Sequence, residues 1–250
     1  MRSCLPGDQR KLHPVATQLH GASLVVTQFE PLLFPEEADY VVGAASGRLE
    51  PSETGREEEG VVDEYRTSHS AALPMQDKVI DCLARRLATI AGMPSSSVEP
   101  LQVTRYTRGQ EYRPHTDDPE RAPPRKRLNT IFTYLSDEGL ANGHCGGATR
   151  FTPVCVNLHT GGQRLRVFSR KGRGVVWANY TPEGNLDTRT EHAGEPITCA
   201  GTTKWGLNAW FLSDEAPQVP RSAKALSRRT RSPRKRAGRV TKRTRKRSTQ

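Results

Sequence analysis

The chain has 250 residues, of which 34% are hydrophobic and 26% charged, and its formal net charge is +11. Residues 221–250 hold 14 of the 38 basic residues and no acidic one, which leaves 24 basic against 27 acidic residues in the remainder. This distribution argues against a globular domain built around a basic nucleic-acid groove and favours a near-neutral body with a polycationic extension. Because no run of about 18 apolar residues exists, we expect no transmembrane segment.

The N-terminal segment is polar and lacks the apolar core of a secretory signal. Five cysteines, an odd number, are widely scattered. Together these features favour reduced thiols and an intracellular location, cytoplasmic or nuclear. We expect residues 1–20 to be a flexible N-terminus, residues 21–215 to form one folded domain, and residues 216–250 to be a disordered basic tail.

The folded domain is predicted to begin with a strand over residues 23–29, because β-branched residues gather there. A helix then opens at Pro35, with proline and two glutamates in its first turn, and a second helix over residues 75–92 shows the clearest 3.6-residue period. After Leu101 the period changes to two, and short apolar segments alternate with Gly, Pro and Asn turns. Those segments are residues 101–106, 130–135, 149–151, 164–168, 174–177 and 204–211. The pattern predicts an α+β, mainly β fold, either a β-sandwich or a jelly roll with N-terminal helices packed on one side.

The segment from Tyr106 to Asp118 contains the first chemical motif. If it forms a strand, His115 and Asp117 face the same side, because strand side chains alternate. A histidine from a neighbouring strand would complete a 2-His-1-carboxylate face, which suits non-haem Fe(II) and leaves coordination positions open. On its own, His-x-Asp equally describes a surface ion pair.

The second motif runs from Glu191 to Trp205 and supplies His192, a Gly-Pro turn, and Lys204 within an apolar strand. Burying an unpaired ammonium is costly. Lys204 therefore either extends to solvent or meets the carboxylate of a buried anionic ligand. A zinc site formed by His144, Cys145, Cys155 and His159 is less favoured, since the cysteine spacing matches no compact zinc knuckle.

These motifs resemble the prolyl 4-hydroxylase branch of the Fe(II)/2-oxoglutarate-dependent dioxygenases. The resemblance rests on Tyr-x-x-Gly-Gln-x-Tyr-x-x-His-x-Asp, the later segments Gly-Gly-Ala-Thr-Arg-Phe and Lys-Gly-Arg-Gly-Val-Val-Trp, and finally His-Ala-Gly-Glu-Pro and Lys-Trp. It covers about residues 23–213 and implies a double-stranded β-helix. Similar sequences place the lysine about ten residues after the second histidine. Here the interval is twelve, and Lys204 is preferred because its Trp and Asn context is kept.

The resemblance implies a set of site residues. His115, Asp117 and His192 would bind iron, and Lys204 would bind the distal carboxylate of 2-oxoglutarate. The same cofactor pocket would be lined by Tyr106, Tyr134, Thr149 and Trp210, while Arg66 and Tyr112 would lie toward the peptide substrate.

The implied reaction is 4-hydroxylation of peptidyl proline, with Fe(2+), 2-oxoglutarate, O2 and L-ascorbate as cofactors and succinate and CO2 as co-products. A proline-containing peptide or protein is the expected partner. Two alternatives stay open: the same chemistry on another protein side chain or a nucleic acid, and a protein whose main role is nucleic-acid binding through the tail. Residues 221–250 would suit either nucleic acid or an import receptor.

Overall fold

The computed structural model describes residues 1–20, 24–53, 64–118, 125–156 and 163–213. All of them belong to one compact unit, Met1–Ala216. The basic segment 216–250 lies outside the described residues, so its predicted disorder and its nucleic-acid or import-receptor partners stay predictions. No helix in the described ranges is long and apolar enough to cross a membrane.

Two antiparallel sheets and two helices make up this unit. The large sheet has eight strands in the order β1-β2-β10-β7-β12-β5-β4-β3, and the small sheet has four in the order β6-β11-β8-β9. The large-sheet strands are β1 (Val15–His20), β2 (Val26–Glu30), β3 (Glu50–Pro51), β4 (His69–Ala72), β5 (Gln102–Tyr106), β7 (Arg127–Tyr134), β10 (Gly174–Ala178) and β12 (Lys204–Leu212). The small-sheet strands are β6 (Tyr112–His115), β8 (Thr149–Val156), β9 (Gln163–Val167) and β11 (His192–Gly194). This confirms the mainly β jelly-roll prediction.

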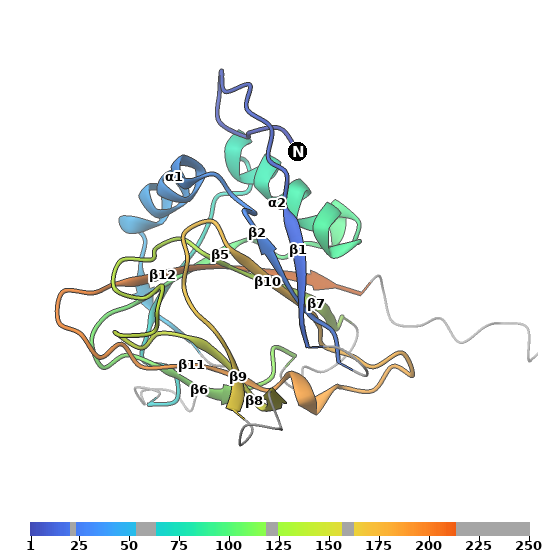
Figure 1. The fold of residues 1–250 in the computed structure, drawn as a ribbon. Helices are drawn as coiled ribbons and strands as arrows, with labels where there is room; N and C mark the ends of the chain where they lie inside the picture. The colour runs from blue at the N-terminus through green and yellow to red at the C-terminus, as the bar shows by residue number, and fades with distance from the viewer. Residues whose placement is uncertain (21–23, 54–63, 119–124, 157–162, 214–250) are drawn as a thin grey trace, which may run out of the picture. The chain divides into compact units, whose positions relative to one another are not determined.

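Both helices pack on one face of the large sheet, and the small sheet faces the other (Figure 1). Helix α1 spans Pro35–Ser46, helix α2 spans Lys78–Ala91, and single 3-10 turns lie at Ser95–Ser97 and Thr188–Thr190. The start of α2 is fixed by Asp77, whose carboxylate accepts hydrogen bonds from the N–H groups of Val79 and Ile80. Its end is fixed by Gly92, which adopts the left-handed conformation with φ 66°.

The alternation of side chains on β7 and β12 separates two cores. Ile131 of β7 and Leu207 of β12 lie in the core beneath the helices, whereas Phe132 and Tyr134 lie in the core between the sheets. Because neighbouring residues point to opposite faces, the same strands hold the helices on one side and the pocket on the other.

Residues 1–20 differ from the sequence-based prediction. The segment Val15–His20 forms the edge strand β1 and pairs with β2, and Leu12 is buried with 1% of its surface exposed. A flexible N-terminus was therefore the wrong expectation. The error has a physical cause, because the strand mixes apolar and polar residues without regular alternation and gains its stability from pairing with β2.

The prediction of reduced thiols is also wrong. Disulfides join Cys4 to Cys82 and Cys145 to Cys199. Their sequence separations of 78 and 54 residues explain why spacing alone did not reveal the pairing. The second disulfide also removes Cys145 from the zinc alternative, and His159 lies outside the described residues.

Candidate metal centre and anion pocket

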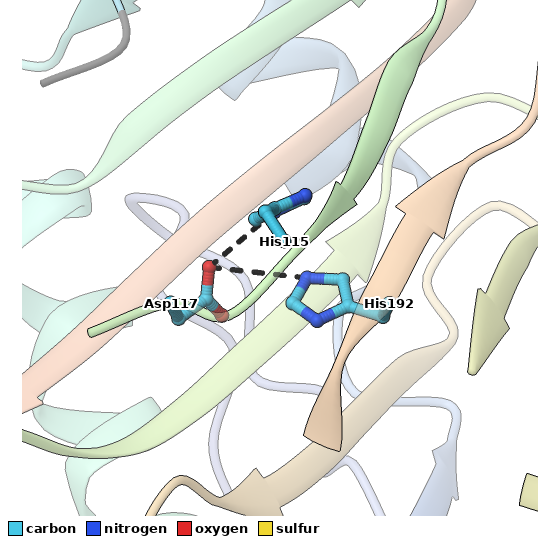
Figure 2. A group of neighbouring side chains, drawn as sticks. All are labelled: His115, Asp117 and His192. Carbon is cyan, nitrogen blue, oxygen red and sulfur yellow. Dashed lines mark ion pairs between the residues drawn. The ribbon is translucent and has the colours of Figure 1, made fainter. Parts of the chain in front are cut away.

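His115, Asp117 and His192 converge at one point between the two sheets (Figure 2). One ligand atom from each lies within 4.8 Å of the others. The Nε2 atoms of His115 and His192 are 3.7 and 3.8 Å from the same Asp117 oxygen, Oδ1. All three side chains are at most 11% exposed, so the structure brings the predicted triad together in a nearly dry site.

Strand pairing explains this convergence. Strands β6 and β11 are antiparallel neighbours, and His115 stands directly opposite His192. Directly opposed side chains on one face of a sheet are close. Asp117 follows two residues after His115, just beyond the end of β6. The pairing of these two strands thus brings together two histidines that lie 77 residues apart in the sequence.

Both histidines are oriented by the main chain. Nδ1 of His115 lies 2.8 Å from the carbonyl oxygen of Arg113, and Nδ1 of His192 lies 2.9 Å from that of Thr190. If each Nδ1–H donates to its carbonyl, each Nε2 presents a lone pair toward Asp117. Histidine ligands of metals in proteins are commonly fixed in this way.

The electrostatics of the triad suit a bound cation. Burial lowers the pKa of His115 to about 3, with the neighbouring His192 acting in the same direction, so the His115 imidazole is neutral at pH 7. Burial alone would raise the pKa of Asp117, but the two imidazoles and the Arg127 guanidinium outweigh it, and the net shift is downward. Asp117 Oδ2 is buried and has no hydrogen-bond partner in the described part of the chain. Two imidazoles and one carboxylate, all aimed at one point, form a donor set for a divalent transition metal.

Lys204 lies in the same pocket, at the start of β12 and directly opposite Tyr106 of β5. The residue is 2% exposed, and its Nζ is 5.4 Å from the Tyr106 ring centroid, 5.2 Å from that of Phe132 and 5.6 Å from that of Tyr134. Burial lowers the pKa of Lys204 to about 7. Because Lys204 is buried, its side chain does not extend to solvent. It forms no ion pair with the described residues, so the carboxylate of a bound anion could neutralise its ammonium.

The other predicted residues divide into two groups. Tyr106, Thr149, Trp210, Arg66 and Tyr112 all line the pocket. Tyr134 does not line it: its hydroxyl donates to Val167 O at 3.0 Å and accepts from Thr149 Oγ1 at 2.8 Å.

Sequence reasoning did not assign Phe132, Trp177, Gly194 or Asn208 to the pocket, although all of them line it. Phe132 could have been found from strand alternation, since it precedes Tyr134 by two residues. Asn208 could have been found in the same way, since it shares one face of β12 with Lys204 and Trp210. Trp177 ends one of the family motifs, but its place in the pocket depends on how the two sheets pack.

Three comparisons with known proteins agree with this geometry. Residues 101–212 match the family model of the 2OG-Fe(II) oxygenase superfamily. The chain is 30% identical to prolyl 4-hydroxylase subunit alpha-1 of Gallus gallus over 197 residues, which are 74% of this chain and 35% of that protein. It is 28% identical to probable prolyl 4-hydroxylase 3 of Arabidopsis thaliana over 203 residues, which are 73% of this chain and 67% of that protein.

The chain belongs to the 2OG-Fe(II) oxygenase superfamily. Its fold is also that of a viral collagen prolyl hydroxylase from Paramecium bursaria Chlorella virus-1, with a TM-score of 0.58 at 22% identity, over 76% of this chain and 96% of that one. The chain spans about a third of the length of the vertebrate relatives that it matches.

The cofactors of this superfamily are Fe(II) and 2-oxoglutarate, and the residues of the pocket fit both. The buried triad offers two imidazole nitrogens and one carboxylate, the donor set of a non-haem Fe(II) site. Lys204, which forms no ion pair with the described residues, lies in the same pocket and supplies a positive charge for a dicarboxylate.

Proposed function

We propose that this protein is a dioxygenase dependent on Fe(II) and 2-oxoglutarate that hydroxylates peptidyl proline at C4. The observation that carries the proposal is the shared pocket of a buried 2-His-1-carboxylate triad and a buried, unpaired lysine. The choice of proline is supported by the prolyl 4-hydroxylases among its relatives.

Each residue has a distinct role in this proposal. His115, Asp117 and His192 hold the iron, and Lys204 binds the distal carboxylate of 2-oxoglutarate, with Tyr106 and Thr149 beside it. When bound, iron and 2-oxoglutarate supply the oxidising chemistry: 2-oxoglutarate and O2 become succinate and CO2, and one oxygen atom enters the substrate as a hydroxyl group. The protein supplies ligand geometry, one anchoring charge and a pocket with little water.

In this proposal, Arg66 and Tyr112 form the substrate side of the pocket. Arg66 Cζ lies 4.8 Å from the Tyr112 ring centroid, and Tyr112 stacks on His115 with centroids 3.5 Å apart. A substrate side chain that reaches the triad would pass these rings. Aromatic faces suit the apolar ring of proline, and the Arg66 guanidinium can donate to a peptide carbonyl.

The proposal is tested with anaerobic protein given Fe(II), 2-oxoglutarate, L-ascorbate and then O2, with and without a proline-rich peptide. We expect peptide-stimulated succinate formation and a peptide product heavier by one oxygen atom. Ascorbate is included because it restores over-oxidised iron in this family.

Variants of the triad sharpen the test. His115→Ala and Asp117→Ala each remove one ligand and should lower turnover by at least a hundredfold, consistent with the loss of a metal ligand. The matched control is His144→Ala, since His144 is exposed and lies outside the pocket. Succinate formation without hydroxylated peptide would disprove the choice of proline, and full turnover in either triad variant would remove that residue from the iron site.

A further inference from the structure

Arg127 connects the metal-binding segment to the aromatic wall of the pocket, although it does not line the pocket itself. It lies at the start of β7 and is half-buried, with 13% of its side chain exposed. Its NH1 group donates to the main-chain carbonyl of Asp117 at 3.1 Å. Asp117 follows the end of β6, so this bond fixes main chain that the sheet does not hold.

The remaining donors of Arg127 bind one carboxylate. Nε donates to Glu99 Oε1 at 2.7 Å, and NH2 donates to Glu99 Oε2 at 2.8 Å. This is a bidentate pair, the geometry in which guanidinium–carboxylate bonds are strongest. Burial would lower the pKa of Arg127, but Glu99 outweighs it and raises the pKa, so the guanidinium keeps its charge.

The same guanidinium stacks on Trp210. Arg127 Cζ lies 3.9 Å from the ring centroid, and the N–H of Glu99 bonds to the carbonyl of Trp210 at 2.9 Å. Glu99, Arg127 and Trp210 therefore form a closed unit, and Trp210 lines the pocket. A planar group with five N–H donors can stack on a ring and bind two acceptors at once, which a lysine cannot do.

We propose that Arg127 is a positioning residue that holds the Asp117 carboxylate in place for iron and couples it to the Trp210 wall. The proposal rests on the proposed function only in taking Asp117 as an iron ligand. Its consequence is that loss of the guanidinium weakens metal binding although no metal ligand is changed.

A matched control is available in Arg173. Its Nε and NH2 bind Glu30 Oε2 at 3.0 and 2.8 Å, its NH1 donates to the carbonyl of Phe168 at 3.1 Å, and 15% of its side chain is exposed. Arg173 thus makes one carboxylate pair and one main-chain bond, as Arg127 does, but it does not line the metal pocket. Arg127→Met and Arg173→Met should therefore lose comparable thermal stability.

The experiment is an anaerobic calorimetric titration of full-length protein with Fe(II) alone, without peptide or O2. We expect Arg127→Met to raise the Kd of Fe(II) at least tenfold, Arg127→Lys to raise it less, and Arg173→Met to change it less than twofold. Tryptophan emission should also shift in Arg127→Met, because the charge above Trp210 is lost.

Equal weakening in the two Met variants would overturn the proposal, since it would reveal only a general loss of stability. A Kd within twofold of the unmodified protein in a folded Arg127→Met would overturn it as well. If Arg127→Met does not fold, Arg127→Lys and Glu99→Gln, which weakens the bidentate pair, decide by the same criteria. Absence of hydroxylation would count against the proposed function without affecting this titration, and absence of Fe(II) binding by the unmodified protein would overturn both.

Discussion

At the scale of single residues, the buried Lys204 ammonium destabilises the ligand-free protein but is suited to bind the carboxylate of 2-oxoglutarate. Its pKa of about 7 in the folded protein lies below the usual lysine value of 10.5, so the unfolded chain holds the proton more tightly. The protonated form therefore destabilises the ligand-free fold fully below pH 7, and this cost declines as the pH rises toward 10.5. A buried charge kept at such a cost is typical of functional sites.

The first prediction follows from that cost. Lys204→Met should raise the melting temperature of the ligand-free protein by a few °C at pH 6, given about 2–4 °C per kcal/mol for a chain of this size. The gain should shrink at pH 10, and 2-oxoglutarate binding should be lost. Differential scanning fluorimetry measures the first effect and calorimetry the second. The control Lys171→Met, which breaks an exposed ion pair with Asp39, should not raise the melting temperature. If Lys204→Met were less stable than the unmodified protein at pH 6, Lys204 would have a stabilising partner.

The second prediction concerns pH and cofactor affinity. A bound carboxylate stabilises the Lys204 ammonium and raises its pKa, so 2-oxoglutarate should bind most tightly below about pH 7. Between the pKa values of the free and bound states, the affinity should fall by up to about tenfold per pH unit. Titrations of metal-free protein from pH 6 to 9 measure this without interference from metal binding. A Kd independent of pH over that range would contradict it.

At the scale of elements, the disulfide Cys145–Cys199 joins two loops at the lysine end of the pocket. Cys145 packs with Tyr106, Leu140 and Ile197. Nearby, Gly147 has a φ of +72°, and a Cβ built there would lie 2.7 Å from Ile197 Cδ1 and 3.6 Å from Lys204 Cδ. Only glycine lets the main chain at this position lie so close to Ile197 and Lys204. The disulfide keeps both loops in this arrangement.

The third prediction tests that arrangement. Replacing Cys145 and Cys199 by serine should raise the Kd of 2-oxoglutarate roughly three- to tenfold, equivalent to about 0.7–1.4 kcal/mol. Replacing Cys4 and Cys82 by serine unlinks the N-terminal segment from helix α2, and neither cysteine lines the pocket. This replacement should lower stability about as much as the first one but leave this Kd within about twofold. Equal effects of the two pairs on the Kd would mean that Cys145–Cys199 has no specific relation to the pocket.

Elements that are stabilised by a local sequence pattern could be predicted, whereas contacts between distant segments could not. Helix α2 was found because its apolar residues repeat every 3.6 residues, and strands β7 and β12 because each is a short apolar segment bounded by turn residues. Strand β11 has only three residues, too few for a period, and was located through His192 and the motif around it. The triad residues were identified by motif, whereas the roles of Glu99 and Arg127 were not, because their contact joins segments 28 residues apart.

At the scale of the whole molecule, the N-terminal segment connects the helical layer to the large sheet. The buried Arg86 of α2 binds Glu37 of α1 through both of its terminal nitrogens, at 2.6 and 2.8 Å, and also donates to the carbonyl of Arg2 at 2.7 Å. Glu37 in turn accepts the N–H of Cys4 at 2.7 Å. Deleting the segment would leave part of this buried ion pair without partners, and leaving such groups unpaired is costly.

The fourth prediction is that deletion of residues 1–20 destabilises the protein, against the sequence-based expectation of a flexible terminus. The deletion removes the Cys4–Cys82 disulfide, worth about 2–5 kcal/mol in small domains, and strand β1 with its pairing to β2. A decrease in melting temperature of about 10 °C or more should follow. Deletion of residues 217–250, which lie beyond the compact unit Met1–Ala216, is the control and should change the melting temperature by less than about 2 °C. If both truncated proteins had the melting temperature of the full chain, residues 1–20 would not stabilise the fold. The contacts of Arg86 and Cys4 would then contribute nothing to the free energy of unfolding.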